Sequence, residues 1–258
     1  MIYNNAILEI SKKNIISNFK FFNNLSNTAI AAATIKSDGY GLGAEKIFKL
    51  LFDNGCKNFF VASTVEGILL RNKFKRGEIY ILNGSENNSY KTFVKHNLIP
   101  ILSNLEDYYK FKNQSLKFGI QINTGINRLG INYKDYDKVD LKDKFLKIII
   151  SHLASADEIK NLYNFKQLTN FQKIKKKCKN NNIIFSLSNS FGSVLSKKYL
   201  FDMIRPGIGI YGGHNNILKL KKFIKPVVKL KAKILQIKKI NKNEYVGYNQ
   251  TFKTTKKT

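Results

Sequence analysis

Short apolar runs recur at regular intervals along this chain of 258 residues. Segments with helical spacing of apolar residues fill most of the gaps between them, for example Val65 to Phe74, Tyr90 to His96 and Leu162 to Cys178. The runs are Ile30 to Ile35, Phe59 to Ala62, Ile79 to Leu82, Ile99 to Leu102, Phe118 to Ile122, Ile148 to Ile150, Ile183 to Leu187 and Leu200 to Ile204. Eight buried strands that alternate with helices predict an α/β fold and favour a (β/α)8 TIM barrel.

A doubly wound sheet is the competing architecture. It needs fewer strands and a phosphate-binding G-x-G-x-x-G turn after its first strand. The glycine-rich stretch after the first run is Gly39-Tyr40-Gly41-Leu42-Gly43, which does not have that spacing. The pattern therefore favours the barrel, preceded by a short strand at Ala6 to Ile10 and an amphipathic helix at Ile15 to Leu25.

The periodicity changes after Gly213. The segment Val227 to Leu235 partly alternates between apolar and charged residues, as a half-buried strand does. We therefore expect a barrel over residues 1–222 and the first strands of an incomplete C-terminal β domain over residues 223–258. So short a second part is too small to be stable by itself.

The composition narrows the class of protein. Apolar residues make up 43% of the chain and charged residues 24%, which is enough for a full core. No apolar run approaches the roughly 20 residues that span a bilayer, and Met1 to Asn5 lacks the basic start of a secretion signal. Cys56 and Cys178 form no C-x-x-C pair, which favours reduced thiols. We expect a soluble cytoplasmic protein with no membrane partner and no metal.

The formal net charge of +28 suggests a nucleic-acid hypothesis. The lysines are spread over nearly every predicted helix, with local runs at Lys175 to Lys177, Lys219 to Lys222 and Lys253 to Lys257. A solvated helix face explains such a run as well as a phosphate contact does, and no aromatic-interleaved basic motif accompanies it. We expect no nucleic-acid partner; an RNA-binding or scaffold protein is an alternative that rests on charge alone.

A single lysine, Lys36, closes the first apolar run, and a glycine-rich turn follows it. Barrels keep their chemistry at the carboxyl ends of their strands. A lysine stem that lies against apolar surface there favours the uncharged amine, which can form a Schiff base with an aldehyde. A solvated lysine in a lysine-rich chain is the alternative.

Polar groups also follow later runs. Arg128, on a turn between Gly125 and Gly130, can grip a carboxylate with its fork of donors, although a surface arginine is the ordinary case. His152 follows the sixth run, and a lone histidine is more often structural than catalytic. Each position fits a barrel-mouth site without proving one.

The seventh and eighth runs lead into Ser188-Asn189-Ser190 and Arg205-Pro206-Gly207-Ile208. Ser190 opens a predicted helix at Phe191 to Ser193, where free N–H groups bind anions, although a simple N-cap is the commoner role. Loops after strands seven and eight are the usual phosphate grip of such barrels.

Together these segments resemble the alanine racemase family. Lys36 to Gly43 is similar to the family's cofactor-lysine segment, with Leu42 in place of the usual histidine. Asn123 to Gly130 resembles D-T-G-M-x-R-x-G, and Ser151 to Ala154 resembles S/T-H-[LF]-A. In the first of these two motifs Asn123 stands for the acid and Ile126 for the methionine.

Three more segments carry the resemblance. Ser186 to Ser190 is similar to H-x-A-N-S, with Ser186 in place of the histidine that supports the family's arginine. Arg205 to Gly212 is similar to R-P-G-I-x-[LI]-Y-G. Val246 to Phe252 is similar to [VS]-x-Y-G-x-[TR]-[FYW], with Asn249 in place of the glycine. The resemblance extends from Ala6 to Phe252.

The resemblance implies a homodimeric isomerase that interconverts L-alanine and D-alanine with pyridoxal 5'-phosphate and supplies D-alanine for peptidoglycan. It implies that Lys36 binds the cofactor and handles the D-face proton. Tyr248, contributed across the dimer interface, handles the L-face proton, and Arg128 contacts the substrate carboxylate and the catalytic tyrosine.

The cofactor-binding residues that the resemblance implies are Lys36, Tyr40, His152, Asn189, Ser190, Arg205, Gly207 and Ile208. The family's histidine stacks on the cofactor ring, the serine and the backbone of the glycine and isoleucine hold the phosphate, and the arginine faces the pyridine nitrogen. An arginine there keeps that nitrogen unprotonated, which limits side reactions such as transamination.

One departure and several alternatives remain open. Gln121 stands where many members carry a carbamylated lysine that orients the arginine, so a neutral amide or a bound anion must serve instead. The same scaffold serves racemases for serine, lysine or a broad range of amino acids, and a single-domain barrel that carries pyridoxal phosphate is a further alternative. We expect the 258-residue chain to bind the cofactor while being unstable or weakly active.

Overall fold

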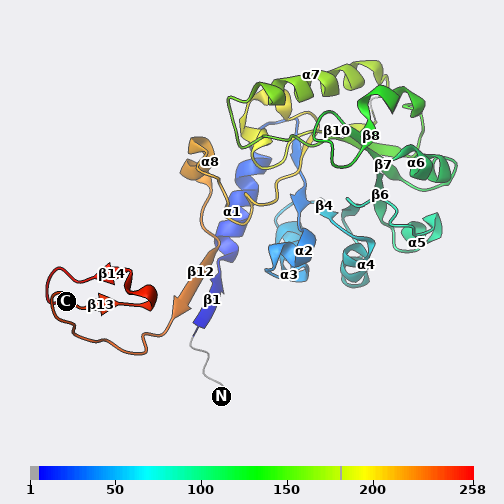
Figure 1. Cartoon of the computed structure of the whole chain (residues 1–258). Helices are drawn as coiled ribbons and strands as arrows, with labels where there is room; N and C mark the ends of the chain where they lie inside the picture. The colour runs from blue at the N-terminus through cyan, green and yellow to red at the C-terminus, as the bar shows by residue number, and fades with distance from the viewer. Residues whose placement is uncertain (1–5, 181) are drawn as a thin grey trace. The chain divides into compact units, whose positions relative to one another are not determined.

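The computed structural model describes residues 6–180 and 182–258. The chain divides into two compact units (Figure 1). One is Ile10–Val228, and the other is made of Lys229–Thr258 and the described residues up to Glu9. The domain boundary at residue 222 stays a prediction, and Met1 to Asn5, which bear on the secretion signal, lie outside the described residues. Within the described part of the chain, no helix is long and apolar enough to cross a bilayer.

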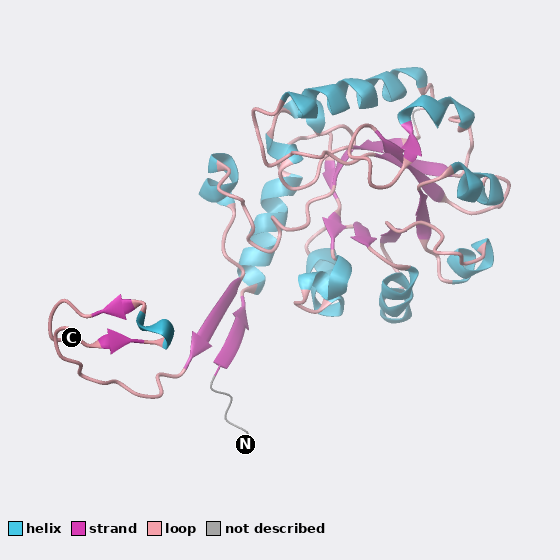
Figure 2. Cartoon of the chain, viewed as in Figure 1, coloured by secondary structure: helices cyan, strands magenta, loops and turns pink. Residues whose placement is uncertain are grey.

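In the larger unit, parallel strands close into a ring (Figure 2). β2 (Ile30–Ala31) and β3 (Ala33–Thr34) are two parts of one strand. Around the ring follow β4 (Asn58–Val61), β5 (Glu78–Ile81), β6 (Ile99–Leu102), β7 (Phe118–Asn123), β9 (Leu146–Ile150), β10 (Ile184–Ser186) and β11 (Met203–Ile204). β11 pairs in parallel with β2, and the N–H of Asp202, just before β11, donates to the carbonyl of Phe185 in β10. The predicted eight-stranded barrel is confirmed.

Helices lie outside the ring of strands (Figure 2). They are α1 (Lys12–Asn23), α3 (Ala44–Asp53), α4 (Thr64–Lys73), α5 (Tyr90–Lys95), α6 (Leu105–Phe111), α7 (Leu162–Lys177) and α8 (Leu218–Phe223). The connection between β7 and β9 contains β8 (Ile131–Asn132) and the 3-10 helix η1 (Tyr133–Lys138). Polar residues start several helices: Asn104 accepts the N–H of Asp107 at 2.7 Å, and Asn161 accepts that of Tyr163 at 2.9 Å, as N-caps do.

Alternation along the strands produces two apolar layers. Phe60 and Tyr80 pack in the small cluster within the barrel, with ring centroids 4.6 Å apart. Their neighbours Phe59 and Ile79 belong to the larger cluster between strands and helices. The barrel is therefore a packed core, and the carboxyl ends of its strands are free to carry a site.

The smaller unit has little core of its own. β1 (Ala6–Ile10) pairs with β12 (Val228–Ala232), and β13 (Tyr245–Val246) pairs antiparallel with β14 (Phe252–Lys253). The 3-10 helix η4 (Tyr248–Gln250) connects the second pair. Within Lys229–Thr258, all of which the structure describes, only Thr254 is buried. Its hydroxyl donates to the carbonyl of Asn241 at 2.6 Å.

Candidate active site

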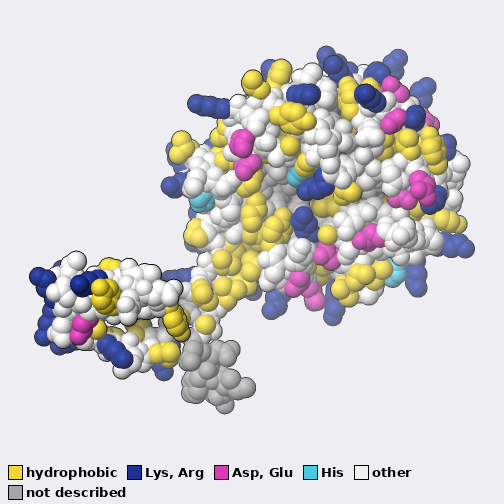
Figure 3. Space-filling model, viewed as in Figure 1, with side chains coloured by type: hydrophobic (Ala, Val, Ile, Leu, Met, Phe, Trp, Pro, Cys, Tyr) yellow, Lys and Arg dark blue, Asp and Glu magenta, His cyan; other side chains and the backbone are white. Residues whose placement is uncertain are grey.

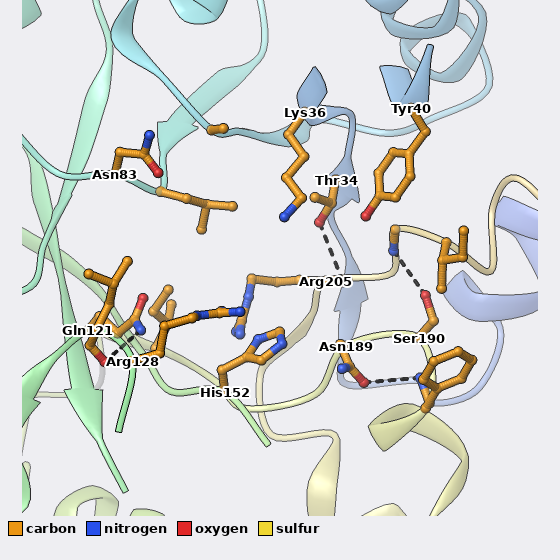
Figure 4. A pocket seen from close by; sticks show the side chains of 17 residues that line it. Thr34, Lys36, Tyr40, Asn83, Gln121, Arg128, His152, Asn189, Ser190 and Arg205 are labelled. Carbon is orange, nitrogen blue, oxygen red and sulfur yellow. Dashed lines mark hydrogen bonds between the residues drawn. The ribbon is translucent and has the colours of Figure 1, made fainter. Parts of the chain in front are cut away.

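Lys36 lies just past the end of β3, at the carboxyl end of the barrel. The N–H of Ile35 continues the ladder by donating to Phe60 at 2.8 Å, and the chain then turns sharply. The turn α2 (Lys36–Tyr40) is not a regular α-helix, because Ser37 and Asp38 have φ of 53° and 51°. Figure 4 shows the amine of Lys36 pointing into a cavity of about 390 Å³.

Tyr40, at the end of the same turn, faces the Arg205 to Ile208 loop. Its hydroxyl lies so close to Gly207 that a Cβ atom added there would be 2.3 Å from it. The ring packs against that of Tyr211 with centroids 4.6 Å apart. Burial raises the pKa of Tyr40, so the hydroxyl stays protonated and can donate a hydrogen bond.

The loops after β10 and β11 are joined through Ser190. Its hydroxyl oxygen accepts the N–H groups of Gly207 and Gly209, both at 3.0 Å, which leaves the hydroxyl proton available to a ligand. Asn189 accepts the N–H of Phe191 at 3.1 Å (Figure 4). Among the described residues, the N–H groups of Ser190 and Ile208 have no hydrogen-bond partner. The two loops thus present free donors, as an anion site requires.

The prediction of an α-helix that opens at Ser190 is wrong. The structure has only a 3-10 turn here, η2 (Gly192–Val194). The side-chain oxygen of Asn189 accepts the N–H groups of Phe191 and Gly192 just before it. The anion-binding donors therefore come from the joined loops rather than from a helix end.

Arg205 is buried beneath the cavity and is 5% exposed. Its guanidinium donates to the carbonyl of Ser186 at 2.7 Å, to the hydroxyl of Ser186 at 2.5 Å and to the carbonyl of Ser151 at 2.6 Å. The Ser186 hydroxyl in turn donates to Met203 at 2.7 Å. Ser186, which stands in place of the family's histidine, thus orients this arginine. Burial lowers the pKa of Arg205 to about 9, which still leaves it cationic at neutral pH.

His152 lines the cavity beside three cations. Its pKa is lowered to about 3, first by burial and then by the positive charges of Arg205, Arg128 and Lys36. The imidazole is therefore neutral at physiological pH. A neutral flat ring at this position is suited to stacking on another ring rather than to proton transfer.

Arg128 reaches the cavity from the exposed loop after β7. In Figure 4 its guanidinium points towards Arg205 and His152. Gln121 supports the loop, because its side-chain amide donates to the carbonyl of Leu129 at 3.0 Å. The neutral amide thus holds the backbone next to Arg128, at the position where many family members use a modified lysine.

The charged side chains that line the cavity are all positive. Lys36, Arg128 and Arg205 line it, and no Asp or Glu is among its described lining residues. A group that carries a phosphate, or a substrate that carries a carboxylate, is therefore attracted to this end of the barrel.

Several lining residues were not predicted: Thr34, Ala62, Leu82, Asn83, Leu129, Ile150 and Phe191. Asn83 directly follows the apolar run Ile79 to Leu82, so its place after a predicted strand was a usable signal. Gln167 of α7 was also missed. It donates to the carbonyl of His152 at 2.9 Å and to the hydroxyl of Thr124 at 3.3 Å, and thus joins the His152 and Arg128 loops. The sequence pattern marks Gln167 only as one polar residue of a helix.

Tyr248 belongs to the smaller unit, in η4. Its side chain is 97% exposed. The other predicted site residues all line the same cavity of the barrel unit: Lys36, Tyr40, Arg128, His152, Asn189, Ser190, Arg205, Gly207 and Ile208. The catalytic role assigned to Tyr248 stays a prediction.

Comparisons with known proteins agree with this class of barrel. Residues 10–215 match the family model described as alanine racemase, N-terminal domain. The alanine racemase of Rickettsia africae is 37% identical over 96% of this chain and 70% of its own length. The crystal structure of alanine racemase from Bartonella henselae, with covalently bound pyridoxal phosphate, superposes with a TM-score of 0.84 at 29% identity, over 99% of this chain and 74% of that one. An alanine racemase from Clostridium difficile superposes with a TM-score of 0.81 at 26% identity, over 100% of this chain and 72% of that one.

The fold and the site therefore define a barrel with a lysine and an anion-binding loop pair at its mouth. The chain belongs to the alanine racemase family.

Proposed function

We propose that this protein interconverts L-alanine and D-alanine with pyridoxal 5'-phosphate as its cofactor. The observation that carries the proposal is the placement of the Lys36 amine in a cationic cavity whose floor is Arg205 and whose edge is the Ser190 and Gly207 loop pair. Polarimetry of L- and D-alanine with added cofactor tests it. The wild-type chain is expected to abolish the optical rotation of either pure enantiomer, and Lys36→Ala is expected not to.

The residues present fit the cofactor. Gly207 can approach the Tyr40 hydroxyl closely only because position 207 has no Cβ, and this brings the backbone of the loop to the edge of the cavity. The free N–H groups of Ser190 and Ile208 and the Ser190 hydroxyl would hold that phosphate. The neutral His152 would stack on the ring, and Arg205 would face the pyridine nitrogen. None of the described residues that line the cavity is acidic, so none repels the negative charge of the group.

Racemisation removes a weakly acidic proton from one face of the α-carbon and returns a proton to the other face. Bound pyridoxal phosphate would supply the electron sink that this step needs. Lys36 acts on the D-face proton, and a second base must act on the opposite face. Arg128 holds the substrate carboxylate in a two-donor fork and so fixes which face each base meets.

Tyr248 is the residue proposed as that second base, supplied by the partner subunit of a homodimer. Its support is the family segment in which it lies, together with its 97% exposure, which leaves its phenol accessible to another chain. The dimer is tested by sedimentation with and without cofactor. The cytoplasmic location expected from the sequence remains a prediction.

Alanine is the proposed substrate, and serine, lysine or a broader set of amino acids are the alternatives within the family. Initial rates with these amino acids, measured under one condition, separate them. The hypothesis of a barrel that carries pyridoxal phosphate without racemase activity predicts cofactor uptake and no change in rotation with any of them.

The nucleic-acid hypothesis gains no support from the face that Figure 3 shows. Figure 3 shows lysine and arginine side chains scattered over the visible face rather than gathered in a single stripe. A charge spread in this way does not form the continuous track that a phosphate backbone needs.

A further inference from the structure

We infer that Glu66 is a positioning residue that holds the turn carrying Lys36 in its active shape. Glu66 lies in the first turn of α4, outside the residues that line the cavity. One carboxylate oxygen accepts the N–H of Ser37 at 2.7 Å, and the other accepts the N–H of Ala62 at 2.8 Å. A single side chain thus joins the segments that leave two neighbouring strands of the barrel.

The two N–H groups lie just beyond the ends of paired strands. β3 and β4 pair in parallel with Thr34 beside Phe60, and the N–H of Ile35 makes the last backbone bond of that pair, to Phe60. Past this point the strands separate, and the Glu66 carboxylate joins the two segments by accepting an N–H group from each. It fixes the backbone on the carboxyl side of Lys36 to the end of β4.

The turn that Glu66 holds is conformationally costly. Ser37, Asp38 and Tyr40 have φ of 53°, 51° and 57°, a region that residues with a Cβ adopt only when surrounding contacts enforce it. Asp38 contributes one such contact, because its carboxylate accepts the N–H of Ala44 at 2.7 Å. Glu66 supplies the contact nearest to Lys36.

An ordinary helix cap does not account for this arrangement. Ser63 is the N-cap of α4, and its hydroxyl accepts the N–H of Glu66 at 3.2 Å. In a capping box the glutamate three residues later bonds back to the N–H of the N-cap residue itself. Here the carboxylate instead reaches Ser37, which is 29 residues away in sequence. Its position therefore serves the Lys36 turn more than the helix.

The role of Glu66 in catalysis rests on the proposed function, but its hold on the turn can be measured without the cofactor. Glu66→Gln keeps the size of the side chain, loses the charge and places an amide donor against one of the two N–H groups. Asp202→Asn is the matched control, because it also removes one carboxylate charge: one Asp202 oxygen accepts the N–H of Phe185 at 2.8 Å and the other pairs with Lys175 at 2.6 Å, at the amino ends of the strands, away from Lys36.

The experiment compares wild type, Glu66→Gln and Asp202→Asn as full chains by hydrogen exchange, thermal unfolding and absorbance titration with pyridoxal phosphate. Loss of a charge-assisted bond is expected to speed amide exchange over residues 36–43 about tenfold in Glu66→Gln, and to weaken cofactor binding about tenfold. Asp202→Asn is expected to change neither, at a comparable melting temperature.

Unchanged exchange over residues 36–43 in Glu66→Gln, with a lowered melting temperature alone, would reduce Glu66 to a helix cap and overturn the inference. If exchange responds as expected while the wild-type chain takes up no cofactor, the hold on the turn is supported and the proposed function fails instead.

Discussion

Arg205 in the barrel unit and Tyr248 in the smaller unit lie at opposite extremes of burial, at 5% and 97% exposed. The arginine is held by three hydrogen bonds to Ser186 and Ser151, whereas the unit around Tyr248 buries a single residue of Lys229–Thr258. Both are assigned to the same site. The fold of the barrel alone therefore preorganises the residues proposed to bind the cofactor, while the residue proposed as second base lies in a unit that does not bury it.

This contrast predicts that cofactor binding and turnover separate by mutation. Changes at the proposed cofactor-binding residues of the barrel should affect both, and changes at the residues proposed to act only on the substrate, Tyr248 and Arg128, should affect turnover alone. The following variants are ordered by the size of the effect that we expect.

Replacing Lys36 with alanine should remove both properties. The variant lacks the amine that we propose binds the cofactor and acts on the D-face proton, so we expect racemisation to fall by about 10³-fold or more. Polarimetry and absorbance after borohydride reduction measure the two losses. Lys49→Ala, which breaks an exposed pair with Asp53, is the control. Turnover that persists in Lys36→Ala contradicts the assignment.

Replacing Tyr248 with phenylalanine should slow turnover strongly and leave cofactor binding unchanged. We expect a loss of about 10²-fold or more in racemisation, since one of two proton-transfer groups is removed. In deuterated water, D-alanine should still exchange its α-proton through Lys36, while L-alanine should not. Tyr245→Phe, an exposed tyrosine of the same unit, should behave as wild type. Loss of cofactor binding in Tyr248→Phe would contradict the prediction that changes in the smaller unit affect turnover alone.

Replacing Arg128 with alanine should slow turnover in both directions by about 10- to 100-fold, because the substrate carboxylate loses its two-donor partner. The two directions must fall together, since the two enantiomers have equal free energy. Cofactor absorbance should not change. Arg76→Ala removes an exposed arginine as the control. Steady-state rates that equal those of the wild type discard this role.

Replacing Gly207 with alanine should weaken cofactor binding by about tenfold, because the new methyl group would lie 2.3 Å from the Tyr40 hydroxyl and push the loop away. Titration by absorbance measures the dissociation constant. Tyr40→Phe in the same chain removes the clashing oxygen and should restore part of the affinity lost at position 207. An unaltered constant in the single variant would show that the loop does not need its close approach.

His152 should make the protein less stable in acid. Its pKa in the folded chain is about 3, below the ordinary 6.5, so between these pH values only the unfolded chain binds the proton. Stability should therefore fall as the pH drops below 6.5, by about 1.4 kcal/mol per pH unit. Urea unfolding at pH 7 and pH 5 should show wild type losing about 2 kcal/mol more than His152→Gln. Equal losses in the two proteins would show that the imidazole is not held neutral.

Much of the barrel site followed from strand periodicity. Each apolar run ended near a polar residue, and parallel strands bring their carboxyl ends together, so Lys36, His152 and Arg205 were expected at one opening. The structure places all three in one cavity. The family motifs then distinguished these residues from ordinary surface lysines and arginines, which periodicity alone does not do.

Other features depend on contacts that no local pattern encodes. The positive φ of Ser37 and Asp38 was not predictable, because neither is glycine and the turn is enforced by Glu66 from a distant helix. The expected helix after Ser190 shrank to a 3-10 turn because Asn189 bonds back to the chain. Local propensity yields to such tertiary bonds.

The proposed function depends on the nitrogen at position 36 carrying the cofactor inside the barrel. Incubating the full chain with pyridoxal phosphate, reducing it with borohydride and sequencing its peptides by mass spectrometry tests this directly. We predict one cofactor mass per chain, on the peptide that contains Lys36. A cofactor found on other lysines, or no stable adduct at all, would contradict the account.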